Sequence, residues 1–347
     1  MKRLLVIGGT RFVGRHVVDT ALAHGMDVTT FTRGVSGEPP AGVRALHGDR
    51  SRPDDLAVLA TGEWDLVVDT SGYVPRQVGD SAAILADRVG HYVFVSTLNT
   101  YPGLGTEPIH DASPTHDCPP DEDWHGTDEE FVHAYGRLKV GCERAVERHF
   151  AGRCTHVRAG VIIGPYDNAA RVPWQVWRIG RVGGELIGPG DPAQEMSFVD
   201  ARDLAEWFLH CGRDGVSGAY AATGPKGQTT IGEVFATIRA LSGSDAEFTW
   251  IPDDFLLAHD VGPWEELPLW SPVSESPYWD VDPSGAMRNG LVCRPIGDTL
   301  ADTWAWVSGL DALPVRADRP RTGLAPDKER RILDAWHASL GHARGAQ

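Results

Sequence analysis

The sequence predicts an α/β protein built on a doubly wound parallel sheet. Three observations predict it. Short apolar segments alternate with helix-like segments through the first half of the chain. The first apolar segment ends in a glycine-rich turn that leads directly into a helix. The alternation lapses near residue 166 of the 347, which indicates a second, smaller lobe.

Each predicted element follows from its own pattern. We expect strands where apolar or β-branched residues run together and end at turn residues, and helices where apolar residues recur every three or four positions. The predicted strands are 3–9, 27–34, 43–49, 64–72, 91–99, 154–165 and 218–224, and the predicted helices are 12–25, 55–60, 77–89, 129–150, 198–210, 229–243 and 326–340. Residues 183–194 are predicted to form turns, and the last seven residues a loose end.

Composition limits the class of partner. Hydrophobic residues make up 41% and charged residues 23%, as in soluble globular proteins. The net charge of −16 disfavours nucleic acid or an anionic membrane as the main partner. No apolar run reaches the ~18 residues of a membrane span, and glycines interrupt the N-terminal run, so we expect neither an anchor nor a signal peptide.

The cysteines predict no disulfide framework. Their number is odd, they are scattered and no CxxC occurs, which fits a reduced, cytoplasmic protein. His110, His116, Cys118 and His125 match no compact ligand spacing, so no metal site is expected. The cysteines are Cys118, Cys142, Cys154, Cys211 and Cys293.

The turn "GGTRFVG" at residues 8–14 predicts an anion site. Its peptide N–H groups and the following helix N-terminus suit a pyrophosphate, and glycines allow close approach of the backbone. The expected contacts are Gly8, Gly9, Thr10, Arg11, Phe12, Val13 and Gly14.

Two further motifs suggest proton chemistry beside that turn. Tyr135 and Lys139 are four residues apart on a predicted helix and therefore share one face. A cation there can lower the pKa of a tyrosine from about 10 and let it exchange protons near neutrality. Ser96 and Thr97 end a predicted strand, at the edge where open α/β sheets bind ligands.

These motifs resemble the extended, epimerase-like branch of the short-chain dehydrogenase/reductase superfamily. "GGTRFVG", "STLNTY", "YGRLK", "RAGVIIGPYDN" and "FVDARDLAEWFLH" occur in the expected order, from residue 3 to about 310. "GGTRFVG", "DTSGY" and "DARDLA" look most like a group that holds bacterial NAD-dependent epimerase-like proteins and chloroplast stem-loop-binding proteins.

The resemblance implies a Rossmann-like doubly wound parallel sheet with a smaller C-terminal substrate-binding lobe that covers the nicotinamide end. The expected NAD(P)-binding domain is 1–165, with 196–224 returning to it. The expected lobe is 166–195 and 225–312, and 313–347 would form a tail with a helix.

The resemblance also implies roles for individual residues. Tyr135 would be the general acid/base and Lys139 would hold the nicotinamide ribose. Thr97 would bind the substrate carbonyl because it lies four residues before Tyr101, with Ser96 as the neighbour to test.

Ser71 and Val161 would be further cofactor contacts. Dehydratases of the family place an acidic pair after the threonine, where this chain has Leu98 and Asn99, so dehydration is disfavoured. Asn99, Arg171 and Trp174 are candidate substrate contacts; an ion pair is an equal alternative for Arg171, and core packing is the default for most of the tryptophans.

Arg11 occupies the position of the middle glycine in the usual G-x-x-G-x-x-G turn. After the second strand this chain has Thr32 and Arg33 in place of the acidic residue that binds the ribose of NAD. Two guanidiniums would favour a 2′-phosphate, so NADP(H) is expected over NAD(H). The alternative is that Arg11 pairs with a surface acid, and Asp49 would suit the adenine edge.

Three functions follow from these observations. The first is an NADP(H)-dependent reductase or dehydrogenase of a small carbonyl or alcohol, with a Thr/Tyr/Lys site. The second is an NAD(P)-dependent epimerase of a sugar nucleotide or related metabolite. The third, a non-redox binding protein of the same fold, is disfavoured by the intact Tyr/Lys pair and the acidic charge. The expected partners are a small-molecule substrate and, as an assembly, a homodimer.

Overall fold

The computed structural model describes residues 1–37, 39–272, 278–314 and 322–345. The chain divides into two compact units. Unit 1 comprises Met1–Ile162, Val199–Pro225 and Val281–Cys293, and unit 2 comprises Ile163–Phe198, Lys226–Asp280 and Arg294–Gln347. Residues 281–293, expected in the smaller lobe, therefore lie in unit 1.

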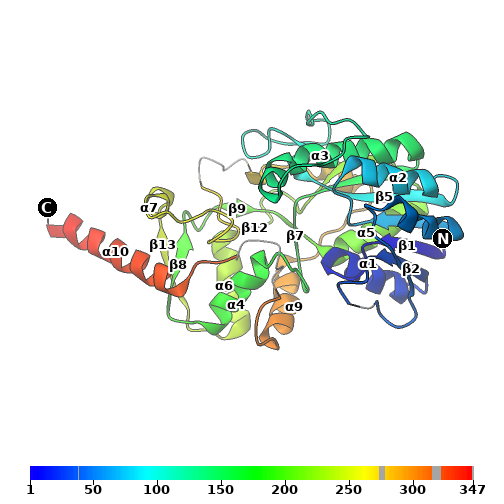
Figure 1. Cartoon of the computed structure of the whole chain (residues 1–347). Coiled ribbons are helices and arrows are strands. Elements are labelled where there is room, and N and C mark those ends of the chain that lie inside the picture. The colour runs from blue at the N-terminus through cyan, green and yellow to red at the C-terminus, as the bar shows by residue number, and fades with distance from the viewer. Residues whose placement is uncertain (38, 273–277, 315–321, 346–347) are drawn as a thin grey trace. The chain divides into compact units, whose positions relative to one another are not determined.

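Unit 1 is organised around a seven-stranded parallel sheet with the order β11-β6-β5-β4-β1-β2-β3 (Figure 1). This confirms the predicted fold class. The chain order reverses between β1 and β4, so their carboxyl ends form the switch point where such sheets bind ligands. The strands are β1 (Arg3–Ile7), β2 (Asp27–Thr32), β3 (Arg44–His47), β4 (Trp64–Asp69), β5 (Val89–Thr97), β6 (Cys154–Ala159) and β11 (Gly218–Ala222).

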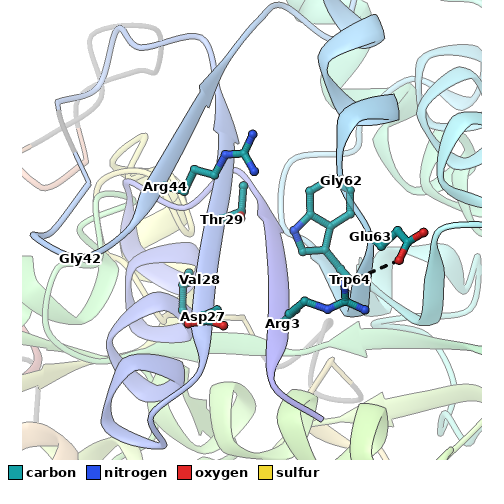
Figure 2. A pocket seen from close by; sticks show the side chains of 9 residues that line it. All are labelled: Arg3, Asp27, Val28, Thr29, Gly42, Arg44, Gly62, Glu63 and Trp64. Atoms are coloured by element: carbon teal, nitrogen blue, oxygen red, sulfur yellow. Dashed lines mark ion pairs between the residues drawn. The ribbon is translucent and has the colours of Figure 1, made fainter.

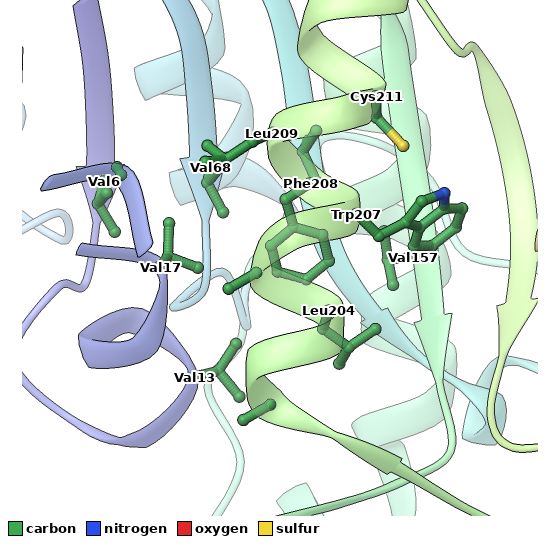
Figure 3. Packing of buried hydrophobic residues seen from close by; sticks show 14 of the residues in the cluster. Val6, Val13, Val17, Val68, Val157, Leu204, Trp207, Phe208, Leu209 and Cys211 are labelled. Carbon is green, nitrogen blue, oxygen red and sulfur yellow. The ribbon is translucent and has the colours of Figure 1, made fainter. Parts of the chain in front are cut away.

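Helices cover both faces of this sheet. Alternate residues along β1 belong to different clusters: Leu4 and Val6 pack with one set of helices, and Leu5 and Ile7 with the other. Figure 3 shows α1 and α5 packed on the first face. The helices of the first face are α1 (Phe12–Ala23) and α5 (Ala201–Asp214), and those of the second are η1 (Pro53–Thr61), α2 (Pro75–Leu85) and α3 (Asp128–Phe150). The short η2 (Leu98–Thr100) and α8 (Ser284–Arg288) complete the elements of unit 1.

The predicted strand 154–165 is wrong as a single element. It consists of β6 in the central sheet and β7 (Val161–Ile163), which pairs with β10 (Phe198–Asp200). Gly160 separates them: its N–H binds Ala222 O, and a Cβ there would lie 2.8 Å from Thr223 Oγ1. The chain therefore passes from the central sheet to the β7–β10 pair at Gly160, a position where a larger side chain would crowd Thr223.

Unit 2 contains regular elements that the sequence patterns did not predict. The parallel pair β8 (Glu185–Pro189) and β13 (Glu247–Ile251) includes part of the segment predicted as turns, and helices α4 (Arg171–Arg181) and α9 (Ile296–Ser308) were not predicted. β8 is short and ends in Gly-Pro, so its partner strand, and not its own propensity, makes it a strand. The remaining elements are β9 (Glu195–Met196), β12 (Thr229–Thr230), α6 (Ile231–Ser242), α7 (Asp253–Ala258) and α10 (Pro326–Gly345).

The sequence explains the start of one helix of unit 2 but not the end of another. Thr230 caps α6, since its side chain accepts a hydrogen bond from Glu233 N while Thr230 N donates to the Glu233 carboxylate. α10 continues to Gly345, so the prediction of a loose end after residue 340 is wrong for the described residues. Within the described part of the chain, no helix has the length and apolar character needed to cross a bilayer.

Candidate functional site

The turn between β1 and α1 has a backbone that only glycine allows. Gly8 has φ +90°, and a Cβ on Gly14 would lie 1.9 Å from Gly8 O. A Cβ on Gly9 would lie 2.5 Å from the Thr30 side chain. The first turn of α1 thus packs directly on the end of β1 and leaves its N–H groups at the switch point, as an anion site requires.

The end of β4 supports this turn from the other side. Thr70 Oγ1 donates to Gly8 O at 2.8 Å and contacts Ile7 O at 3.1 Å. Ser71 lies beside them, with Oγ 3.4 Å from Ile7 O. Ser71 therefore lies next to the glycine turn, and Thr70, which the sequence analysis did not select, fixes the turn.

A buried ion pair that the sequence analysis missed lies beneath the same edge. Arg50 Nη2 lies 2.5 Å from Asp69 Oδ2, and both contact Tyr92 OH. Despite the opposing effect of burial, Arg50 lowers the pKa of Asp69. The available signal was Asp69 itself, which directly follows three apolar residues in β4, because a buried charge must be paired.

Arg11 and Arg33 are both exposed. Arg11 is the N-cap residue of α1, and its side chain makes no cap hydrogen bond. Arg33 lies near Asp49: hydrogen bonds from Ser51 are the largest cause lowering the pKa of Asp49, and the Arg33 charge adds to them. Asp49 Oδ1 thus already accepts two hydrogen bonds from Ser51, and its other oxygen has no side-chain donor among the described residues.

Lys139 lies in the middle of α3 and is buried against the sheet. Its Nζ donates to Gly72 O at 2.7 Å and Val95 O at 2.6 Å, and lies 4.1 Å from the Phe94 ring centroid. Burial lowers the pKa of Lys139 to about 8. Its ammonium is therefore fixed at the carboxyl ends of β4 and β5.

Tyr135 lies one helical turn before Lys139, beside Tyr73. The Tyr73 and Tyr135 ring centroids are 6.5 Å apart, and Lys139 Nζ is 5.5 Å from the Tyr73 centroid. The structure thus brings the predicted Tyr/Lys pair to the carboxyl edge of the sheet, together with an aromatic side chain that the sequence analysis did not select.

Ser96 and Thr97 have different environments. Ser96 is buried and donates to Glu143 Oε1 at 2.5 Å, and Glu143 is paired with Arg158 at 2.7 Å. Thr97 is half-buried, caps η2 and accepts from Asn99 N at 3.2 Å. Ser96 is therefore held by a buried ion pair, whereas Thr97 lies at the strand end.

Glu143 and Arg158 form a second buried pair that the sequence analysis missed. Burial works against ionisation, but Arg158 lowers the pKa of Glu143, and Arg158 also donates to Tyr101 OH at 2.9 Å. The sequence signal for this pair was Arg158 itself, because an arginine within a fully buried six-residue strand needs a charged partner.

The remaining predicted contacts lie in different places. Val161 is buried in β7, and exposed Asn99 follows Thr97 in η2. In unit 2, Arg171 begins α4 near Asp167; burial raises the pKa of Asp167 to about 6 and the Arg171 charge opposes this rise. Trp174 packs against the apolar cluster of unit 2, with Arg178 over its ring at 5.3 Å.

A surface pocket in unit 1 lies at the wrong edge of the sheet for this chemistry. Figure 2 shows it around the first residues of four neighbouring strands, with Arg3 and Glu63 paired at 3.7 Å. These are the amino ends of the strands, opposite the glycine turn. Its lining residues are Arg3, Asp27, Val28, Thr29, Gly42, Arg44, Gly62, Glu63 and Trp64.

Comparison with known proteins decides the family. The family model described as "NAD dependent epimerase/dehydratase family" matches residues 4–221. The chain belongs to the NAD-dependent epimerase/dehydratase family. This family member is an NAD(P)-dependent enzyme of the extended short-chain dehydrogenase/reductase type, and the resemblance seen in the sequence is confirmed. Curated protein sequences give no match to it.

Solved structures share the fold of this epimerase/dehydratase family member at low sequence identity. The Bordetella bronchiseptica enzyme WbmH, in complex with NAD+, matches with TM-score 0.65 and 16% identity over 90% of this chain and 100% of its own. UDP-N-acetylglucosamine 4-epimerase from Bacillus cereus matches with TM-score 0.64 and 17% identity, over 90% and 99%. UDP-glucose 4-epimerase from Thermotoga maritima matches with TM-score 0.62 and 17% identity, over 88% and 98%.

The residues present fit a nicotinamide dinucleotide. The glycines at 8 and 14 let the N-terminus of α1 pack directly on the end of β1, and Lys139 is fixed by two carbonyls at the same sheet edge. Gly8, Gly9 and the N-terminus of α1 would hold the phosphates, and Lys139 the nicotinamide ribose.

Proposed function

We propose that this protein is an epimerase that inverts one carbinol carbon of a sugar nucleotide or related metabolite. The Tyr135–Lys139 pair carries the proposal, because it provides a proton donor and acceptor beside a fixed cation at the ligand-binding edge of the sheet. Support comes from the matched family and from the 4-epimerases among the solved structures. The reductase that the sequence favoured has less support, since the matched family model is described as an epimerase/dehydratase family.

In this proposal the chain positions a hydroxyl group and moves its proton. A bound nicotinamide dinucleotide supplies the capacity to accept a hydride and return it. The Tyr135 phenol oxygen accepts the substrate hydroxyl proton and returns it once the configuration at the carbinol carbon is inverted. Lys139 holds positive charge near that oxygen, and Thr97 Oγ1 hydrogen-bonds the substrate oxygen.

We propose NADP(H) as the preferred cofactor, on the basis of Arg11 and Arg33. Within the described residues, neither side chain makes a hydrogen bond or ion pair, and both are exposed, so both are available to a 2′-phosphate. The solved neighbours WbmH and WbmG are described with NAD, and the two arginines are the feature of this chain that argues for the phosphorylated form.

The test begins with the purified protein. We expect denaturation to release a nicotinamide dinucleotide, and incubation with UDP-glucose, UDP-N-acetylglucosamine and related sugar nucleotides to give a stereoisomer by NMR without net formation of reduced cofactor. Tyr135→Phe should retain the dinucleotide and lose ~10²–10⁴-fold in turnover.

Tyr220→Phe is the matched control, because its hydroxyl only donates to Ser217 O and should leave turnover unchanged. A protein that consumes added NADPH stoichiometrically with a carbonyl substrate, and forms no stereoisomer, would be a reductase and not an epimerase.

A further inference from the structure

Three metal-ligating side chains gather at the end of unit 1 remote from Tyr135. Glu147 lies in the last turn of α3, and Cys154 and His156 lie on one face of β6, two residues apart. Their ligand atoms all lie within 4.8 Å of one another. Glu147 is twelve residues, about three helical turns, beyond Tyr135, so this cluster is separate from the candidate active site.

The distances within this cluster match a tetrahedral ion. Zinc bonds of about 2.0 Å to oxygen and nitrogen and about 2.3 Å to sulfur place tetrahedral ligand atoms about 3.3–3.6 Å apart. His156 Nε2 lies 3.5 Å from Glu147 Oε2 and 3.7 Å from Cys154 Sγ. The third distance between candidate ligand atoms, from Cys154 Sγ to Glu147 Oε2, is shorter at 2.9 Å because a thiol proton forms a hydrogen bond between these atoms.

Burial and charge favour a cation at this position. Cys154 and His156 are 0% and 6% exposed, whereas the Glu147 side chain is 54% exposed and leaves an entry path. His156 Nδ1 is buried and has no hydrogen-bond partner within the described residues, so the hydrogen-bonding contacts of this imidazole are those that its Nε2 makes to the cluster, and its ring packs edge-on against Phe94. A carboxylate at a helix C-terminus is also unfavourable unless a cation neutralises it.

The hydrogen bond within the cluster marks the proton that a metal ion would replace. Cys154 Sγ donates to Glu147 Oε2, so the thiol hydrogen lies between two candidate ligand atoms.

We propose that Glu147, Cys154 and His156 form a binding site for a thiophilic divalent cation, zinc foremost. Sulfur, imidazole and a single carboxylate exclude magnesium and calcium by ligand softness. Binding forms one metal–sulfur, one metal–nitrogen and one metal–oxygen bond and releases the thiol proton to solvent, with water as the fourth ligand on the side of Glu147.

The ion would join the C-terminal end of α3 to β6. Tyr135, Lys139, Glu143 and Glu147 are spaced four residues apart along α3, so the ion would fix the helix that carries the catalytic pair without entering the chemistry. His156 lacks the acceptor at Nδ1 that tight zinc sites provide, so we expect affinity ~10–100-fold below such sites.

The test uses the full-length protein, treated with chelator and titrated with Co²⁺ and Zn²⁺. We expect one equivalent of Co²⁺ to produce a thiolate-to-cobalt charge-transfer band that Zn²⁺ displaces, and Zn²⁺ to raise the melting temperature. Cys154→Ser should abolish the band. Cys293→Ser removes the one cysteine that is not fully buried and should leave the band unchanged.

Absence of a saturable band, or a band that persists in Cys154→Ser, would overturn the proposal. If Cys154→Ser does not fold, Glu147→Gln decides the matter, because this side chain is half exposed and its loss leaves the core intact. An unchanged Co²⁺ affinity in Glu147→Gln refutes the site, and at least a tenfold loss supports it.

Discussion

Replacement of Gly136 by alanine should destabilise the protein, although helix propensity predicts the opposite. Gly136 lies within α3, directly after Tyr135, where alanine normally stabilises a helix by about 1 kcal/mol. A Cβ at Gly136 would lie 1.8 Å from Asn99 O, a backbone atom in the turn that follows Thr97. A carbon and a carbonyl oxygen normally stay about 3.3 Å apart, so helix and turn must separate by about 1.5 Å.

The expected cost exceeds the gain from propensity. Overpacking of this kind costs ~1–3 kcal/mol, and here the neighbour is backbone and cannot rotate away. The same displacement moves Tyr135 relative to Thr97, and a shift of about 1 Å at reacting groups can cost ~10²-fold in rate. We therefore expect Gly136→Ala to lose both stability and turnover.

Urea denaturation measures the first effect, with Gly79→Ala as the matched control. Gly79 lies inside α2, and a Cβ there would meet nothing closer than 3.7 Å, so that variant should gain up to about 1 kcal/mol. If Gly136→Ala is as stable as wild type or more stable, the close packing of α3 on the 98–100 turn is refuted.

Three further predictions follow from the candidate site and from the sheet. Thr97→Ala should slow turnover with little loss of stability. Ser96→Ala should lower the unfolding free energy more, because the buried Glu143 carboxylate then loses a hydrogen-bond donor. The reverse pattern would exchange the roles of the two residues. Wild type should bind NADP(H) more tightly than NAD(H) by about one to two orders of magnitude, and the double variant Arg11→Gly, Arg33→Ala should remove this preference with NAD(H) affinity nearly unchanged. Titration of both cofactors at fixed salt measures these affinities. Equal binding of both cofactors by wild type would contradict the prediction. Burial lowers the pKa of His91 to about 4, so between pH 6.5 and 4 the unfolded chain takes up a proton that the folded chain does not. Stability should fall by up to about 3 kcal/mol as the pH drops through that window, and His91→Gln should flatten the profile relative to wild type in parallel melts.

Features that depend on neighbours along the chain could be predicted from the amino-acid sequence. Alternating apolar segments predicted the parallel sheet, because buried strands and the helices that cover them have different periods. The turn at Gly8 and Gly14 and the pair Tyr135 and Lys139 depend on spacings of six and four residues, and the structure brings both to one edge of the sheet.

Tertiary structure decided what depends on partners distant in sequence. β8 is a strand because β13 pairs with it, and Gly160 divides a predicted strand because Thr223 fills the space beside it. The cluster of Glu147, Cys154 and His156 likewise combines a helix with a strand, so only the packing of α3 on β6 brings these three side chains together. Local periodicity fixes which face a residue occupies, but only packing between elements fixes which side chains meet across it.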